Sequence, residues 1–511
     1  MNDGFWHKAW QFALLFGVIT LLGASIAIQG NFMTESEVQQ LLADDGASGS
    51  GSGSGTTDTG WPVDASIRPD LVPISDLAAA PGGEEHLSYA PDVPAPIARS
   101  EQATYDISIE SIEGVCPLDP ANGVTTDMWG FRVAGDDEIV CGSPGPILRG
   151  RVGDVMNITL TNMPENTHPH NIDFHAVTGQ GGGAADLTVN PGESATIQVR
   201  LLYPGAFMYH CAYGDVPSHI AHGMYGMVIV DPEAPLPEVA HEWAIMQSEW
   251  YVGETSDGEA PFDPDSLFDE EPRYVTFNGR TDALTGDNTL KMNVGERARI
   301  YFVNEGLNLD SNFHPIGSHW DLVYPEGATH QSNRVIRGSQ STLVVAGGGT
   351  VVELDAIVPS TVILVDHALV RTFYKGAIGT IVIEGDANPE IFGVPGADPG
   401  DGGDEPAEAF DEEVIIPVNA FDPATPEDAY DPLDIEVTVG TTIRWTNLDA
   451  IAHTVTSGSS DGIVGEPDGI FESGFLEEGD TFTYTFDEVG EFPYYCLPHP
   501  WMVGTVTVVD A

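Results

Sequence analysis

The chain has 511 residues, of which 79 are Asp or Glu and 17 are Lys or Arg, so its formal net charge is −62. A chain this acidic repels the phosphates of nucleic acids, which argues against a nucleic-acid partner. Hydrophobic residues make up 41% of the chain, enough for buried cores in several domains. The acidic residues are spread along the whole sequence, which favours a salt-adapted protein over one with a single acidic tail.

The first 34 residues predict a membrane anchor. Residues 9–34 carry no charge, and the mostly apolar run 9–28 is about long enough to cross a bilayer as a helix. Lys8 precedes this run and acidic residues follow it, so the positive-inside tendency places the rest of the chain outside the cytoplasm. A cleaved signal peptide with a weak processing site near Ala27 is the alternative. The length of the apolar run favours an exported protein with an uncleaved anchor.

Residues 35–97 are predicted to form a low-complexity tether, followed by a Pro-rich segment that precedes the first domain. Within this segment, residues 46–60 consist almost entirely of Gly, Ser, Thr and Asp. Such composition is typical of a flexible linker. We therefore expect the folded part of the chain to begin near residue 98.

Residues 98–232 contain short strand-like runs separated by Gly, Pro, Asn and Asp, whereas helix-period patterns are scarce. The runs span 105–112, 155–160, 195–201 and 226–230. This pattern is typical of antiparallel β-sandwiches. It recurs at 233–390 and at 412–511, with an acidic Gly/Pro linker at 391–411. We predict an all-β chain with three Greek-key sandwich domains.

The chain has four cysteines, and two of them, Cys116 and Cys141, lie outside any metal-ligand motif. An exported chain enters an oxidising compartment, where these two residues can form a disulfide. Two buried free thiols are the alternative.

The first sandwich carries two groups of candidate ligands. If residues 170–175 are extended, His170 points to one face of the strand and His175 to the other. His210 and Cys211 are neighbours, so their side chains also point apart. This sorts the ligands into an inner set and an outer set. The inner set is His170, Cys211, His219 and Met224, and the outer set is Asp173, His175 and His210.

The two sets suit different chemistry. Two imidazoles, a thiolate and a thioether are the ligands of a blue electron-transfer copper. The outer set lacks a thiolate, but it suits a catalytic copper if one more ligand arrives and one position stays open. The second sandwich has no cysteine and offers His314, His319 and His367. Ordinary core or surface histidines are the alternative interpretation of these residues.

The third sandwich repeats the blue-copper ligand set. Cys496, His499 and Met502 share one loop after a strand, and His453 lies upstream. This combination predicts a second electron-transfer copper. The segment resembles the small cupredoxins, and its short Cys-x2-His-x2-Met loop is most similar to that of amicyanin.

Several motifs together resemble the two-domain copper nitrite reductases over about residues 90–390. They are HNIDFHAVTG, YHC, a Cys-x7-His-x4-Met loop, FHPIG and LVDHALVRTFYKGA. The resemblance implies cupredoxin-type sandwiches and a homotrimer in which a neighbouring subunit supplies His367. It implies a type 1 copper on His170, Cys211, His219 and Met224, a type 2 copper on His175, His210 and His367, a catalytic pair Asp173 and His314, and Ile316 over the open copper position.

The resemblance implies reduction of nitrite to nitric oxide at the type 2 copper, with electrons arriving from the type 1 copper through the His210–Cys211 peptide. We expect the C-terminal domain, with a type 1 copper on His453, Cys496, His499 and Met502, to act as a tethered electron donor. An upstream small redox protein or membrane electron carrier would reduce it.

A multicopper oxidase and a non-catalytic copper carrier are the alternative functions. A multicopper oxidase would need about eight cluster histidines and a His-Cys-His segment, but Ala212 follows Cys211 and only His168-Pro-His170 has the His-x-His spacing. A non-catalytic, membrane-tethered copper carrier would not need Asp173 or the outer histidines. Both are weaker interpretations of these motifs than the reductase.

Overall fold

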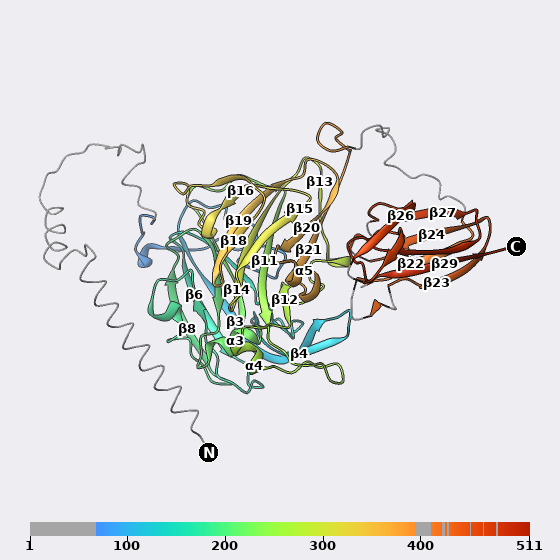
Figure 1. Cartoon of the computed structure of the whole chain (residues 1–511). Coiled ribbons are helices and arrows are strands. Elements are labelled where there is room, and N and C mark those ends of the chain that lie inside the picture. The colour runs from blue at the N-terminus through green and yellow to red at the C-terminus, as the bar shows by residue number, and fades with distance from the viewer. Residues whose placement is uncertain are drawn as a thin grey trace, which may run out of the picture. The chain divides into compact units, whose positions relative to one another are not determined.

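The computed structural model describes residues 68–393 and 410–510, except residues 419, 422–424, 427–428, 450, 463 and 477–478. The predicted N-terminal anchor and the Gly/Ser-rich part of the predicted tether lie outside these residues. No helix within them is long and apolar enough to cross a membrane. The prediction of an all-β chain is confirmed, because three pairs of β-sheets make up the described part (Figure 1).

The first sandwich packs two five-stranded sheets on a core that contains Ile109, Phe131 and Leu160. One sheet has the order β1 (Ala78–Ala79), β3 (Ala103–Asp119), β6 (Val155–Asn162) and β8 (Ser194–Arg200), with β4 (Val124–Val133) paired to β3. The other has the order β2 (Leu87–Ser88), β5 (Ile147–Arg151), β10 (Tyr225–Asp231), β9 (Gly205–His210) and β7 (Asp173–Phe174). The short elements are η1 (Ile74–Asp76), η2 (Gln180–Gly183) and α3 (Val216–Ala221). The expectation that the folded part begins near residue 98 is wrong, because β1 and β2 pair with strands of this sandwich.

The second sandwich has its own core around Phe302, Phe313 and Trp320. Its six-stranded sheet runs β12 (Tyr274–Phe277), β11 (His241–Trp250), β14 (Arg297–Gly306), β19 (Gly348–Asp355), β16 (Trp320–Tyr324) and β17 (Ile336–Ser339). Its five-stranded sheet runs β13 (Leu290–Asn293), β21 (Ile378–Glu384), β20 (Ser360–Asp366), β15 (Ser311–Ile316) and β18 (Thr342–Val344). The short elements are α4 (Pro264–Phe268), η3 (Gly286–Asn288), η4 (Pro325–Gly327) and α5 (Leu369–Lys375).

The C-terminal sandwich is built around Trp445, Phe471 and Tyr494. Its three-stranded sheet runs β22 (Glu412–Ile416), β24 (Thr441–Asn447) and β27 (Thr481–Phe486). Its five-stranded sheet runs β23 (Asp434–Thr438), β29 (Val503–Val509), β28 (Gly490–Tyr495), β25 (Thr456–Ser460) and β26 (Gly465–Glu472).

The first two sandwiches share an apolar interface. Residues of β10 such as Met227 and Ile229 pack with Met246 of β11 and Val303 of β14. All seven residues of β10 are buried, because one face lies on the core of its own sandwich and the other lies on the neighbouring sheet. The two sandwiches therefore share one apolar cluster.

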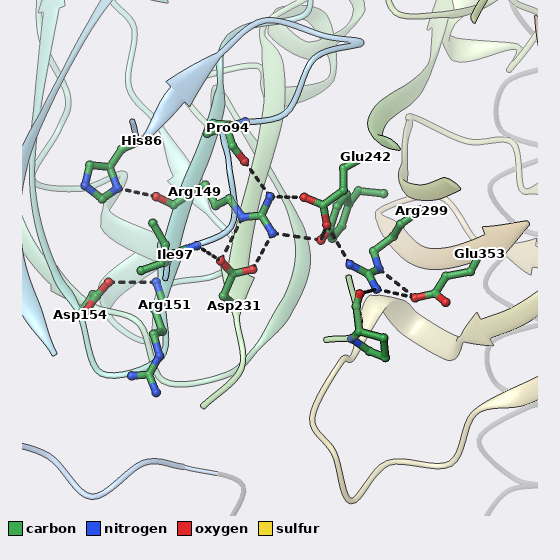
Figure 2. A network of polar contacts seen from close by, with 12 residues as sticks. His86, Pro94, Ile97, Arg149, Arg151, Asp154, Asp231, Glu242, Arg299 and Glu353 are labelled. Carbon is green, nitrogen blue, oxygen red and sulfur yellow. Dashed lines mark hydrogen bonds and ion pairs between the residues drawn. The ribbon is translucent and has the colours of Figure 1, made fainter. Parts of the chain in front are cut away.

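A buried chain of ion pairs crosses the same interface (Figure 2). Arg149 lies 2.8 Å from Asp231 and 2.6 Å from Glu242. Arg299 in turn lies 2.9 Å from Glu242 and 2.7 Å from Glu353. Two of the chain's few cations are therefore placed where they join strands of both sandwiches.

The β3–β4 hairpin extends from the first sandwich. A disulfide joins Cys116 on β3 to Cys141, with the two Cα atoms 5.8 Å apart. Cys116 packs with Met128 of β4 and with Trp250 and Val252 of the second sandwich. The hairpin thus adds a third contact between the two sandwiches.

Candidate metal centres

The first centre is a cluster of two imidazoles and one thiol buried in the first sandwich. His170 Nδ1 lies 4.0 Å and His219 Nδ1 lies 3.3 Å from Cys211 Sγ, and the two nitrogens lie 3.3 Å apart. Metal bonds of about 2.0–2.3 Å in a trigonal plane place such ligand atoms roughly 3.5 Å apart. The three side chains therefore fit a single metal ion of the kind that His₂Cys sites hold.

Local backbone structure brings these ligands together. His170 exchanges two backbone hydrogen bonds with Val189, at 3.0 and 2.9 Å. Cys211 follows β9, and its N–H donates to the Met224 carbonyl at 3.0 Å, while α3 carries His219. The Met224 side chain is fully buried in the same core as Cys211. All four predicted inner-set residues are therefore in one region.

Burial shifts the pKa values of two candidate ligands in the first centre. Burial and neighbouring imidazoles lower the pKa of His219 to about 4, so its ring is neutral at pH 7. Burial raises the pKa of the Cys211 thiol to about 11. Binding of a metal ion would therefore release the thiol proton.

The second centre lies on the other side of β9, where His210 is the last residue of the strand. His175 Nε2 and His210 Nε2 lie 3.1 Å apart, and a carboxylate oxygen of Asp173 lies within 4.8 Å of both. His210 Nδ1–H donates to the Cys211 carbonyl at 3.1 Å, which leaves Nε2 free to bind a metal. Desolvation, together with His210, lowers the pKa of His175.

The expectation that residues 170–175 form one extended strand is wrong. β7 is only two residues long, and His175 lies in a turn, so alternation along a strand does not orient its side chain. The ladder between β7 and β9 does so instead: Asp173 lies opposite His210, and the His175 N–H donates to the Met208 carbonyl at 3.1 Å. The outer set predicted from the sequence nevertheless comes together.

His314 and His367 meet on the second sandwich. They lie on β15 and just after β20, which are paired strands, and their ring centroids are 5.1 Å apart. His314 Nδ1–H donates to the Gln340 carbonyl, so its Nε2 stays available. Ile316, half-buried, ends β15, and His319 is exposed.

One chain does not complete the outer centre. Among the described residues, the ligand atoms that lie within 4.8 Å of one another there belong to Asp173, His175 and His210, without His367. The His367 side chain is exposed. The role of His367 in a different copy of the chain therefore stays a prediction.

A buried carboxylate that the sequence analysis missed, Asp366, binds the backbone after His367 and the backbone of the neighbouring strand β15. Asp366 accepts hydrogen bonds from the backbone N–H groups of Asn312 at 3.1 Å and Ala368 at 3.2 Å. Its other oxygen accepts from Arg371 at 2.6 Å. The motif LVDHALVR contained Asp366 and Arg371, but their pairing became visible only in the fold.

An aromatic side chain, also missed, covers the first centre. The Trp129 ring lies 4.0 Å from His222, 4.3 Å from His168 and 5.0 Å from His219, measured between ring centroids. Trp129 comes from β4 of the disulfide-linked hairpin. The hairpin thus contributes directly to the environment of the predicted ligand His219.

The third centre repeats the first within the C-terminal sandwich. Cys496 Sγ lies 3.6 Å from His453 Nδ1 and 3.4 Å from His499 Nδ1, and the two nitrogens lie 3.2 Å apart. Burial and His453 lower the pKa of His499 to about 3, and burial raises the pKa of Cys496 to about 11. The Cys496 N–H donates to the carbonyl of the buried Met502 at 3.1 Å. The four predicted residues again suit one metal ion.

Two family profiles match parts of the chain. One, described as copper binding proteins of the plastocyanin/azurin family, matches residues 425–509. The other, described as multicopper oxidase, matches residues 117–234. The first range contains the third centre and the second contains both centres of the first sandwich.

Curated relatives cover the first two sandwiches. Over 307 residues the chain is 42% identical to the copper-containing nitrite reductase of Neisseria meningitidis, which spans 60% of this chain and 76% of that protein. Over 269 residues it is 35% identical to the copper-containing nitrite reductase of Cereibacter sphaeroides, spanning 49% and 71%. A solved copper nitrite reductase from Nitrosomonas europaea is 33% identical with a TM-score of 0.48, covering 56% of this chain and 96% of that one.

Proposed function

Because the chain belongs to the copper-containing nitrite reductase family, we propose that two of its three centres transfer electrons and that the outer centre reduces nitrite. The protein is a copper-dependent oxidoreductase that reduces nitrite to nitric oxide: NO2⁻ + 2H⁺ + e⁻ → NO + H2O. Its domains are of the cupredoxin type, and the C-terminal one is a plastocyanin/azurin-like copper-binding domain. When bound, copper supplies the electron and the Lewis acidity of this reaction.

The observation that carries the proposal is the placement of His210 and Cys211. The Cys211 thiol belongs to the buried first centre and His210 Nε2 to the outer centre, although the two residues are neighbours in the chain. A single peptide therefore connects the ligand set that suits electron storage with the one that suits substrate. We assign the first and third centres to type 1 copper, and His175, His210 and His367 to type 2 copper.

Two side chains of the outer region are suited to proton delivery. Asp173 lies beside both outer imidazoles, and His314 presents a free Nε2 beside His367. A carboxylate and an imidazole can each hold a proton and pass it to substrate oxygen. Ile316 supplies apolar surface on the same strand as His314.

We infer that the enzyme assembles as a homotrimer. His367 is exposed, and so are the apolar side chains of Leu369 (43%) and Val370 (63%) on the adjoining α5. A neighbouring copy that brings His367 to His175 and His210 would cover this apolar face and complete the outer centre. Closed cyclic assembly satisfies this need for each copy in turn.

A multicopper oxidase is not favoured. Each of the three metal-binding groups among the described residues contains only three His, Cys, Asp or Glu side chains. Ala212 occupies the place where an oxidase would carry its second histidine. A non-catalytic electron carrier is not favoured either, because that function does not require the ligands of the outer centre.

Anaerobic assay of the copper-loaded protein in high salt tests the function. We expect nitric oxide to form from nitrite with a small artificial reductant, measured by a nitric oxide electrode. Oxygen uptake in place of nitric oxide would support the oxidase. A full copper content with neither reaction would contradict the proposal.

The C-terminal domain is proposed to act as a tethered donor. Its attachment to the same chain raises its effective concentration at the core, which can exceed what a free partner reaches. Deletion of residues 409–511 is expected to slow turnover with a protein reductant and to spare turnover with a small artificial one. Cys496→Ser in the full chain is the matched control, because it keeps the domain and removes its thiolate. Equal slowing with both reductants would contradict the relay.

The location and environment are also proposals. The apolar N-terminal run favours an exported enzyme held at the membrane, with an upstream small redox protein or membrane carrier as reductant. The charge of −62 favours a high-salt environment, where screening weakens repulsion between acidic side chains.

A further inference from the structure

Both thiolate centres contain a histidine whose second ring nitrogen contacts a carboxylate. At each one, the upstream histidine turns Nδ1 toward the cysteine sulfur and Nε2 toward a carboxylate. His170 Nε2 lies 2.9 Å from Glu113, and His453 Nε2 lies 3.0 Å from Asp449. Both rings are fully buried. The carboxylate fixes the tautomer of the ring, because Nε2–H must donate and Nδ1 is left to bind copper.

The two carboxylates differ in how much of their charge other groups take up. Glu113 also accepts hydrogen bonds from the Thr167 N–H at 3.0 Å, the Thr167 hydroxyl at 2.7 Å and the His168 N–H at 2.9 Å. Its side chain is 10% exposed. Its charge is therefore distributed over several donors and the solvent.

The Asp449 carboxylate is more deeply buried. Its side chain is 2% exposed, and within the described part of the chain it accepts a hydrogen bond from His453 Nε2. Electrostatic interactions are stronger where water is excluded. The negative charge of Asp449 therefore acts more strongly on the His453 ring than the charge of Glu113 acts on the His170 ring.

Negative charge on a ligand imidazole stabilises Cu(II) relative to Cu(I), because the oxidised ion carries the larger positive charge. We propose that Asp449 lowers the reduction potential of the C-terminal copper more than Glu113 lowers that of the core copper. Electron flow is then directed from the C-terminal domain to the core. One electron leaves Cu(I) on Cys496, which becomes Cu(II), and reduces Cu(II) on Cys211 to Cu(I), without proton transfer. The direction rests on the proposed role of the C-terminal domain as donor.

Spectroelectrochemical titration of the copper-loaded full chain tests this inference. Each thiolate centre is measured alone, in a Cys211→Ser or Cys496→Ser background. In the unmodified ligand shells, we expect the C-terminal centre to have the lower potential. Asp449→Asn is expected to raise that potential enough to reduce the equilibrium constant for transfer at least tenfold, which is about 59 mV for one electron. Glu113→Gln is expected to raise the core potential by less.

Asp449→Glu is the matched variant, because it keeps the carboxylate and should retain most of the low potential. A core potential at or below that of the C-terminal centre would overturn the inference, and so would equal shifts in the two amide variants. If Asp449→Asn does not hold copper, the comparison of the two unmodified centres decides. Potentials do not depend on turnover, so failure here is distinct from failure of the nitric oxide assay.

Discussion

Replacing Asp173 with Asn is expected to reduce nitrite turnover by about 10²–10⁴-fold, because an amide cannot hold or deliver the proton that general acid–base catalysis requires. The reaction consumes two protons for each electron. A carboxylate oxygen of Asp173 lies within 4.8 Å of a ring nitrogen of His175 and of a ring nitrogen of His210. Its position is tightly defined, since a Cβ at Gly182, where φ is +55°, would collide with the Asp173 carboxylate. Turnover is measured as nitric oxide release at fixed copper content.

The copper content of the Asp173→Asn variant should stay unchanged, because His175, His210 and His367 remain. Asp186→Asn is the matched control: it removes an exposed carboxylate further along the same segment and should keep full activity. Full turnover in Asp173→Asn would remove this residue from proton delivery. Loss of copper would assign it a role in holding the metal instead.

Arg149→Met is expected to lower the free energy of unfolding by about 3–5 kcal/mol, since it removes one partner of a buried ion-pair network and leaves the Asp231 carboxylate without its cation. Arg149 is 2% exposed and pairs with both Asp231 and Glu242 (Figure 2). Methionine fills much of the same volume, so the loss reports on charge more than on packing. Thermal unfolding of the variant and the unmodified protein, at the same salt and copper content, measures the effect.

Arg273→Met provides the comparison. Arg273 is 37% exposed and pairs with Glu254, whose side chain is 92% exposed. Exposed pairs contribute about 0–1 kcal/mol, and salt weakens them further. Equal losses of stability for the two variants would show that the Arg149 network does not stabilise the interface between the sandwiches.

Much of the fold was predictable because the strands alternate and are bounded by turn residues. Strands β6 (Val155–Asn162) and β10 (Tyr225–Asp231) contain the expected runs at 155–160 and 226–230. The expected run 105–112 lies within the longer β3 (Ala103–Asp119). β4 was missed, because the hairpin packs against the second sandwich and its strand pattern depends on that contact.

The candidate ligand groups were predictable for a different reason: thiolate, imidazole and thioether recur at short spacings that the chemistry of copper requires. Their supporting groups were not predictable, because they come from distant parts of the sequence. Glu113 lies 57 residues before His170, and no local pattern links the two. Asp449 lies only four residues before His453, yet a lone Asp at that spacing is common in so acidic a chain.

The adjacency of His210 and Cys211 has a consequence for the timing of catalysis. Neighbouring Cα atoms are held about 3.8 Å apart by covalent geometry. Neither ionic strength nor movement between domains can lengthen this connection. The distance for the proposed electron transfer between the two centres therefore stays constant wherever the sheet stays folded. With the proposed roles of the C-terminal domain and Asp173, we expect the rate of the enzyme to be set on either side of this electron transfer. The two controlling steps would be the docking of the C-terminal domain and the delivery of protons to Asp173.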